Sequence, residues 1–266
     1  MHPTVAQWLD ELRHAVTFYT CVPAGWLGAD EPRRDPTSMR RAMRMAPLAG
    51  LLVGAVGGVV VAAAALLTGS HLVAAISAVA ATMLLTGALH EDGLADAADA
   101  LAGKTPAKRL EIMRDSRIGS FGAAALLLSI LLRVALISSV AQAGGVGAAV
   151  LALIAAHAVS RGLALWLPYR LPPARKSGAA VAFGRPDERV LLEAVLISLV
   201  IAFLTAASVA DVIATGVAVL VSALAVLGAA WLAERLFGGQ TGDLSGATQQ
   251  FAEIAFLFGL AATIGP

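Results

Sequence analysis

The sequence predicts an all-α protein: a polytopic transmembrane helical bundle of about seven spans, with a cytoplasmic amino terminus and an active site on the cytoplasmic face. The mean hydropathy is +0.80, and only 14% of the residues are charged. Apolar residues form runs close to the roughly 20 that cross a bilayer as a helix. These runs are apolar on every side, unlike the single apolar stripe of a surface helix.

Seven segments are expected to form the spans, and the last is short enough that it could cross only partly. They are residues 46–67, 72–89, 121–140, 146–167, 191–209, 212–233 and 251–264. Together they indicate one integral membrane domain over residues 1–266. Its cytoplasmic parts are an amphipathic amino-terminal segment at 1–45 and motif loops at 89–120, 170–190 and 234–250.

Positive charge is confined to alternate loops, which predicts the orientation by the positive-inside rule. Lys and Arg precede the first span and follow the second, fourth and sixth, whereas the loops at 69–71, 142–145 and 210–211 have none. The basic residues are Arg13, Arg33, Arg34, Arg40, Arg41, Arg44, Lys104, Lys108, Arg109, Arg114, Arg117, Arg170, Arg175, Lys176, Arg185, Arg189 and Arg235. Apart from Asp211, almost every carboxylate is on the same side of the membrane as these basic residues. We therefore expect the active site to face the cytoplasm. The net charge of only +1 gives no reason to expect a nucleic-acid partner.

Two local patterns lie outside the spans. Residues 8–19 are typical of an amphipathic helix, which lies in the membrane interface or docks against the bundle. Its apolar side has Trp8, Leu9, Leu12, Ala15, Val16 and Tyr19. Thr105 and Pro106 predict the N-cap and first residue of a short helix that ends near Arg114. Cys21 is the only cysteine, which excludes an internal disulfide.

The segment HEDGLADAADALAG (90–103) has four carboxylates within nine residues. Asp92, Asp96 and Asp99 are spaced i, i+4, i+7 and share one helical face, whereas Glu91 projects about 100° away and is expected to be solvated. Stacked carboxylates repel unless a cation lies between them, and hard oxygen ligands suit Mg²⁺ or Mn²⁺. The alternative is a solvated acidic helix end, stabilised by the helix dipole. We favour the metal site because the acids follow a span directly and TGD (241–243) adds Asp243 on the same side.

Basic residues that could neutralise a phosphate group occur in the same cytoplasmic regions. IMRDSRIGSFG (112–122) contributes Arg114, Asp115 and Arg117, and Arg175 lies in the second loop. Arg161 is near the cytoplasmic end of the fourth span, so it either binds phosphate or extends to the lipid headgroups. Within the spans, Arg133 predicts a structural partner and His157 a hydrogen-bonded interior histidine.

Four segments of the chain together resemble the cobalamin-5′-phosphate synthase family of adenosylcobinamide-GDP ribazoletransferases. They are HEDGLADAADAL, EIMRDSRIGSFG, AVSRG and GGQTGDLSGATQQFAE. The resemblance extends from FYTCVP (18–23) to the last span. The matching motif positions are His90, Asp92, Gly93, Asp96, Asp99, Arg114, Asp115, Ser116, Arg117, Gly119, Ser160, Arg161, Gly239, Thr241, Gly242, Asp243 and Gly246. Glu91, Ala100 and Cys21 depart from the family's usual residues.

The resemblance implies a Mg²⁺-dependent transfer of adenosylcobinamide phosphate from adenosylcobinamide-GDP to α-ribazole or its 5′-phosphate, with release of GMP. It implies a multi-pass protein of the bacterial inner membrane, in contact with lipid. Asp92, Asp96, Asp99 and Asp243 would hold the metal, and His90 or an unligated aspartate would act as base. The residues expected to bind substrate or phosphate are Arg114, Asp115, Arg117, Arg161, Arg175, Thr241 and Gly242. The sequence leaves open the preferred acceptor, the number of metal ions and whether the chain forms a homo-oligomer.

Two other functions fit part of the pattern. A transporter with a cytoplasmic acidic gate would explain the hydropathy, but transporters place ionisable groups near the bilayer midplane. A CDP-alcohol-type phosphotransferase would also use clustered aspartates, but the arginine that such enzymes have in this motif does not follow Ala95.

Overall fold

The computed structural model describes residues 4–28 and 36–264, so Arg33 and Arg34 of the charge argument lie outside the described residues. Every regular element in these ranges is a helix, as the sequence predicts, and an isolated bridge pairs Pro173 with Gln240. The longer helices are α1 (Val5–Tyr19), α3 (Ala46–Thr68), α4 (His71–Thr86), α5 (Leu89–Asp99), α7 (Ser120–Ala164), α10 (Glu188–Thr205), α12 (Val212–Phe237) and α13 (Gly242–Thr263). The short ones are η1 (Ala24–Leu27), α2 (Pro36–Ala42), η2 (Met43–Met45), η3 (Ala100–Ala102), α6 (Pro106–Ile112), α8 (Trp166–Arg170), α9 (Ala179–Phe183) and α11 (Ala207–Ala210).

Several helices are long and apolar enough to cross a bilayer, which marks the chain as a membrane protein. Four continuous stretches of the described chain meet that test, Thr37–Thr68, Ser120–Arg170, Glu188–Ala210 and Val212–Phe237, and α4 with α5 makes a fifth if the bent pair is one span. The backbone of α7 leaves helical geometry at Gly145 (φ 81°, ψ 170°). This break separates the two spans expected at 121–140 and 146–167. The total of about seven spans stays a prediction.

The last predicted span and the loop before it need a correction. Residues 251–264 are not a separate short helix but the second half of α13, which begins at Gly242, and α12 continues to Phe237. The predicted loop at 234–250 therefore shrinks to a turn between Phe237 and Gly242. Thr241 starts α13 as its N-cap, with Oγ1 accepting a hydrogen bond from the Leu244 N–H at 3.2 Å.

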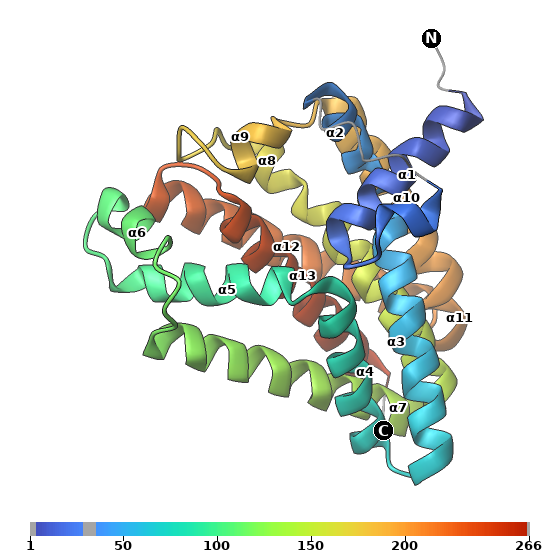
Figure 1. The fold of residues 1–266 in the computed structure, drawn as a ribbon. Helices are drawn as coiled ribbons and strands as arrows, with labels where there is room; N and C mark the ends of the chain where they lie inside the picture. Colours follow the sequence, from blue (N-terminus) through green and yellow to red (C-terminus); the bar gives the residue numbers. More distant parts are fainter. Residues whose placement is uncertain (1–3, 29–35, 265–266) are drawn as a thin grey trace.

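A sharp bend separates α4 from the acidic helix α5. Gly87 and Ala88 both have left-handed backbones, with φ of 62° and 54°, and a helix cannot continue through two such residues. The axis of α5 is bent by 90° from that of α4. Figure 1 shows α5 beside the first half of α7. Because it does not continue the direction of α4, we do not count α5 as part of a span.

The bundle interior is built on close contact between α3 and the second half of α7. A Cβ added at Gly54 would lie 2.6 Å from the Ile154 Cα, so a larger residue there would separate the two helices. The core also takes Phe256, Leu257 and Leu260 from α13, all fully buried. These three side chains bind the second half of α13 into the apolar core.

The amino-terminal helix α1 docks against the bundle through its second half. Ala15 and Val16 pack with Met45 and Ala49 at the start of α3. Glu11 forms an ion pair of 2.6 Å with Arg44, whose other nitrogen lies 2.7 Å from Glu193 on α10. Of the two arrangements open from the sequence, the structure has the docked one.

The predicted loop at 170–190 contains the short helix α9 and is joined to the turn before α13. The Ala174 N–H donates to the Gln240 carbonyl at 2.8 Å, and the Gln240 N–H donates to that of Pro172 at 2.9 Å. This pairing holds the neighbouring Arg175 beside the start of α13.

Candidate active site

The acidic segment forms the helix that its spacing predicts, and α13 packs directly onto it. A Cβ added at Gly93 of α5 would lie 2.7 Å from the Asp243 carbonyl oxygen. Only glycine permits this approach of the two backbones. The contact joins Asp92 and Asp96 to the TGD segment, 150 residues further along the chain, as the two motifs together had suggested.

The carboxylates interact electrostatically. The pKa of Asp96 is raised from 3.8 to about 6 by partial burial and by the charges of Asp92, Asp243 and Asp99. Burial also raises the pKa of Asp243, although Arg175 opposes this shift from 3.2 Å away. The protein alone therefore leaves negative charge uncompensated at this position.

Asp99 belongs to the acidic face but has a structural role in addition. Its Oδ2 accepts a hydrogen bond from the Gly119 N–H at 2.7 Å, and its Oδ1 accepts one from the Gly122 N–H at 2.8 Å. The first turn of α7 has no cap from its own N-cap residue, so Asp99 supplies it. Both carboxylate oxygens are thus engaged, which leaves Asp99 less suited to bind metal than the sequence pattern indicated.

Two cavities meet at the start of α13. The larger, of about 240 Å³, is bounded on its polar side by His90, Asp92, Arg161, Asp243 and Gln249. The smaller, of about 70 Å³, is lined by Arg175, Ser177 and Thr241 and shares Gly242 and Asp243 with the larger. Predicted site residues from four separate segments therefore line two adjacent cavities.

Arg161 lies in the wall of the larger cavity and does not extend to lipid headgroups. The residue is 2% exposed, and its Nη1 is 3.0 Å from the His157 Nδ1. Its guanidinium also lies over the Tyr19 ring, 5.8 Å from the centroid. Headgroup contact, one of the two alternatives, is excluded by this burial. His157 is the hydrogen-bonded interior histidine that was expected.

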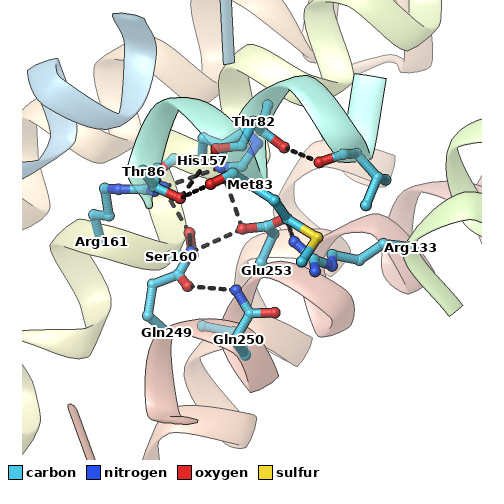
Figure 2. Close-up of polar contacts among 12 residues, drawn as sticks. Thr82, Met83, Thr86, Arg133, His157, Ser160, Arg161, Gln249, Gln250 and Glu253 are labelled. Carbon is cyan, nitrogen blue, oxygen red and sulfur yellow. Dashed lines mark hydrogen bonds and ion pairs between the residues drawn. The ribbon is translucent and has the colours of Figure 1, made fainter. Parts of the chain in front are cut away.

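Behind this wall is a buried polar network that sequence reasoning missed (Figure 2). Glu253 of α13 lies 3.2 Å from the His157 Nδ1, 3.6 Å from Arg133 and 2.8 Å from the Gln249 Nε2. Gln249 also donates to the Ser160 Oγ at 2.9 Å. The motif segment AVSRG is thereby connected to α13. The signal in the sequence was the run of polar residues in GATQQFAE, inside an otherwise apolar helix.

Glu91 belongs to this network, and the expectation that it is solvated is wrong. Its carboxylate is 2.9 Å from Arg133 and both side chains are buried. The position about 100° from the aspartates was right, but the bend before α5 turns that side towards the bundle interior. Arg133 has the structural partner that was predicted for it.

The basic segment after α6 is less closely connected to the cavities. Arg114, Asp115 and Arg117 are all exposed, and none of them lines either cavity. Arg117 instead pairs with Asp115 at 2.6 Å, and this hydrogen bond lowers the pKa of the Asp115 carboxyl to about 2. The helix before them begins at Thr105 and Pro106 as predicted and ends at Ile112, two residues early.

The carboxylates suit a hard divalent cation that completes its coordination with other oxygens. No three Asp, Glu, His or Cys side chains of the described chain form a ready-made metal cluster. Mg²⁺ seldom needs one, because it usually binds one or two carboxylates together with water and substrate phosphates. Asp92, Asp96 and Asp243 are partly accessible oxygen donors with excess negative charge, and so fit such a cation.

The described residues define an all-helical membrane protein with acidic and basic side chains in the wall of one cavity. A family model described as cobalamin-5-phosphate synthase matches residues 11–261, so the chain belongs to that family.

Curated relatives match over nearly the whole length. A protein of Azorhizobium caulinodans is 45% identical, one of Xanthobacter autotrophicus 42% and one of Allorhizobium ampelinum 37%. The match covers 95%, 94% and 97% of this chain and 95%, 95% and 98% of the relatives, in the same order. Each is named adenosylcobinamide-GDP ribazoletransferase. No solved structure matches the chain.

Proposed function

We propose that this protein transfers the adenosylcobinamide phosphate moiety from adenosylcobinamide-GDP to α-ribazole or α-ribazole 5′-phosphate. GMP leaves, and adenosylcobalamin or its 5′-phosphate forms. Family membership supports the reaction. We place the active site at the larger cavity because Asp92, Asp243 and Arg161 all line it.

The two cavities suit the two reacting ends of such a transfer, the phosphate groups of the donor and the acceptor nucleoside. Arg175 reaches the smaller cavity and pairs with Asp243, and a guanidinium there can bind phosphate oxygens of the GDP-linked donor. The larger cavity takes the acceptor. Asp243 lies at the boundary between them, where the phosphorus and the attacking hydroxyl must meet.

The transfer is a displacement at phosphorus. The acceptor's ribose 3′-hydroxyl oxygen forms the new bond to phosphorus, the bond from phosphorus to the GMP oxygen breaks, and GMP takes that electron pair. The hydroxyl proton goes to His90, or to Asp92 where that carboxylate does not bind the metal; both line the larger cavity. Burial, followed by the charge of Arg161, lowers the pKa of His90 well below its ordinary value, so its imidazole is neutral and only weakly basic.

Mg²⁺ is the expected cofactor, and Asp92, Asp96 and Asp243 would hold it, with Asp99 as a further candidate. When bound, it would neutralise negative charge on the bridging pyrophosphate. The alternating charge of the loops supports a cytoplasmic site in the inner membrane.

The test uses the full chain purified into lipid vesicles, with adenosylcobinamide-GDP, α-ribazole or its 5′-phosphate, and Mg²⁺. Equal amounts of GMP and corrinoid product are expected. A CDP-alcohol offered in place of the donor should give no product. A correctly folded protein that releases no GMP with either acceptor would refute the proposal.

A further inference from the structure

The larger cavity has an aromatic side that the transfer chemistry does not explain. Phe18 makes edge-to-face contacts with Tyr19 and with Phe183, each with centroids 4.8 Å apart. Phe18 and Tyr19 end α1, whereas Phe183 ends α9, 164 residues later in the chain. We call Phe18, Tyr19 and Phe183 the aromatic cluster. All three line the cavity, together with apolar side chains such as Met43 and Leu165.

The aromatic cluster is directly connected to the reactive side of the cavity. The Tyr19 ring is stacked on the His90 ring, with centroids 5.8 Å apart and planes 7° from parallel. Asp92 is two residues beyond His90 and lines the same cavity. A molecule bound against the aromatic cluster therefore has its other end beside the proposed proton acceptors.

The chemistry of the cluster indicates which part of the two substrates it can bind: guanine, the corrin ring or the dimethylbenzimidazole base. Apart from the Tyr19 hydroxyl, the phenyl, thioether and aliphatic groups on this side offer no hydrogen bonds. Guanine would therefore leave most of its polar edge unsatisfied there, at a cost of about 1–3 kcal/mol for each unsatisfied group. The corrin ring with its amide side chains exceeds a cavity of about 240 Å³. The dimethylbenzimidazole base of α-ribazole is a flat, apolar bicycle, which aromatic side chains bind by stacked or edge contacts.

We infer that the aromatic cluster is the binding site for the apolar bicyclic base of the acceptor nucleoside, and that it directs the ribose towards His90 and Asp92. This inference rests on the proposed function. It makes the cluster a determinant of acceptor specificity, separate from the residues that bind phosphate.

The experiment compares Phe183→Ala and Phe18→Ala with Phe258→Ala, a matched control on the exposed side of α13 (57% exposed). Loss of one aromatic contact should raise the KM for α-ribazole about tenfold in both cluster variants. The KM for adenosylcobinamide-GDP should stay within about twofold of the parent value, and Phe258→Ala should change neither KM.

Direct binding keeps the test independent of turnover. Free 5,6-dimethylbenzimidazole should bind the purified parent protein in equilibrium dialysis, compete with α-ribazole and bind about tenfold more weakly to Phe183→Ala. Phe183→Leu replaces that variant if it does not fold.

Three results would overturn the inference. They are failure of dimethylbenzimidazole to bind, competition by guanosine instead, and a raised KM for the GDP-linked donor alone in the cluster variants. A parent protein that turns over neither substrate would refute the proposed function. The dialysis measurement would still show whether the aromatic cluster binds the bicyclic base.

Discussion

The carboxylate of Glu91 lies 2.9 Å from the guanidinium of Arg133, and the two side chains are only 5% and 2% exposed. They come from α5 and the first half of α7, which Figure 1 shows side by side. Glu253 is the second acid near Arg133, at 3.6 Å. One buried region thus contains two acidic and two basic side chains, Glu91, Glu253, Arg133 and Arg161. Removal of one charge therefore leaves an opposite charge without its partner.

Glu91→Gln should therefore destabilise the protein substantially. Breaking a buried ion pair typically costs about 3–5 kcal/mol because the remaining charge loses its compensation. The thermal midpoint in detergent is the measurement. Glu111→Gln is the matched control, since Glu111 forms an exposed pair with Lys108, and such pairs contribute about 0–1 kcal/mol. The double variant Glu91→Leu with Arg133→Met should recover part of the loss. Equal shifts for Glu91→Gln and Glu111→Gln would show that the pair adds no stability.

Asp96→Asn should fold normally and lose turnover by about two orders of magnitude or more, the size expected when an electrostatic contact to a transition state is lost. Asparagine keeps one oxygen but removes the charge that would balance a cation. GMP release at several Mg²⁺ concentrations is the assay, with Asp10→Asn on the exposed side of α1 as control. Parent-like turnover of Asp96→Asn at low Mg²⁺ would exclude Asp96 from the metal site.

The raised pKa of Asp96, about 6, makes stability and Mg²⁺ binding depend on pH. The folded state keeps this proton up to about pH 6, whereas the unfolded chain releases it near pH 4. The stability contributed by the protonated carboxyl is thus present below about pH 4 and is lost as pH rises to about 6. Mg²⁺ competes with that proton, so its stabilising effect on the thermal midpoint should be larger at about pH 7.5 than at about pH 5.5. Asp96→Asn should weaken this pH dependence. If the effect of Mg²⁺ on the thermal midpoint depends on pH equally in Asp96→Asn, another titratable group causes that dependence.

Arg161→Lys should reduce product formation at least about tenfold while the protein still inserts and folds. A lysine cannot reproduce the planar guanidinium that contacts His157 and lies over Tyr19. Arg189→Lys, in an exposed pair with Glu193, is the control and should keep parent activity. Nearly parental activity in Arg161→Lys would show that the reaction does not need a planar guanidinium at this position.

The orientation is tested by cysteine labelling in a Cys21→Ser background, because Cys21 is exposed and would react. Lys104→Cys and Ser177→Cys should react from the cytoplasmic side, and Thr68→Cys from the opposite side. All three parental residues are exposed. Labelling of Lys104→Cys and Ser177→Cys from different sides would contradict a single cytoplasmic site.

Much of this protein follows from its sequence alone. Uninterrupted apolar runs require helices in a bilayer, because backbone groups have no other partners there. The spacing of Asp92, Asp96 and Asp99 determined that they share a helical face, and Thr105 with Pro106 determined where α6 begins. These features depend on residues within a few turns of each other, so local patterns suffice to predict them.

Only the tertiary structure decided which way those faces point. The direction of α5 depends on left-handed backbones at Gly87 and Ala88, and a positive φ at alanine is stable only where surrounding packing imposes it. That bend turns Glu91 inwards to Arg133 and brings Asp99 to the start of α7. Likewise, the cavity wall combines Phe18, Arg161 and Asp243 from helices far apart in the chain. Their meeting depends on the packing of whole helices, which no local spacing contains.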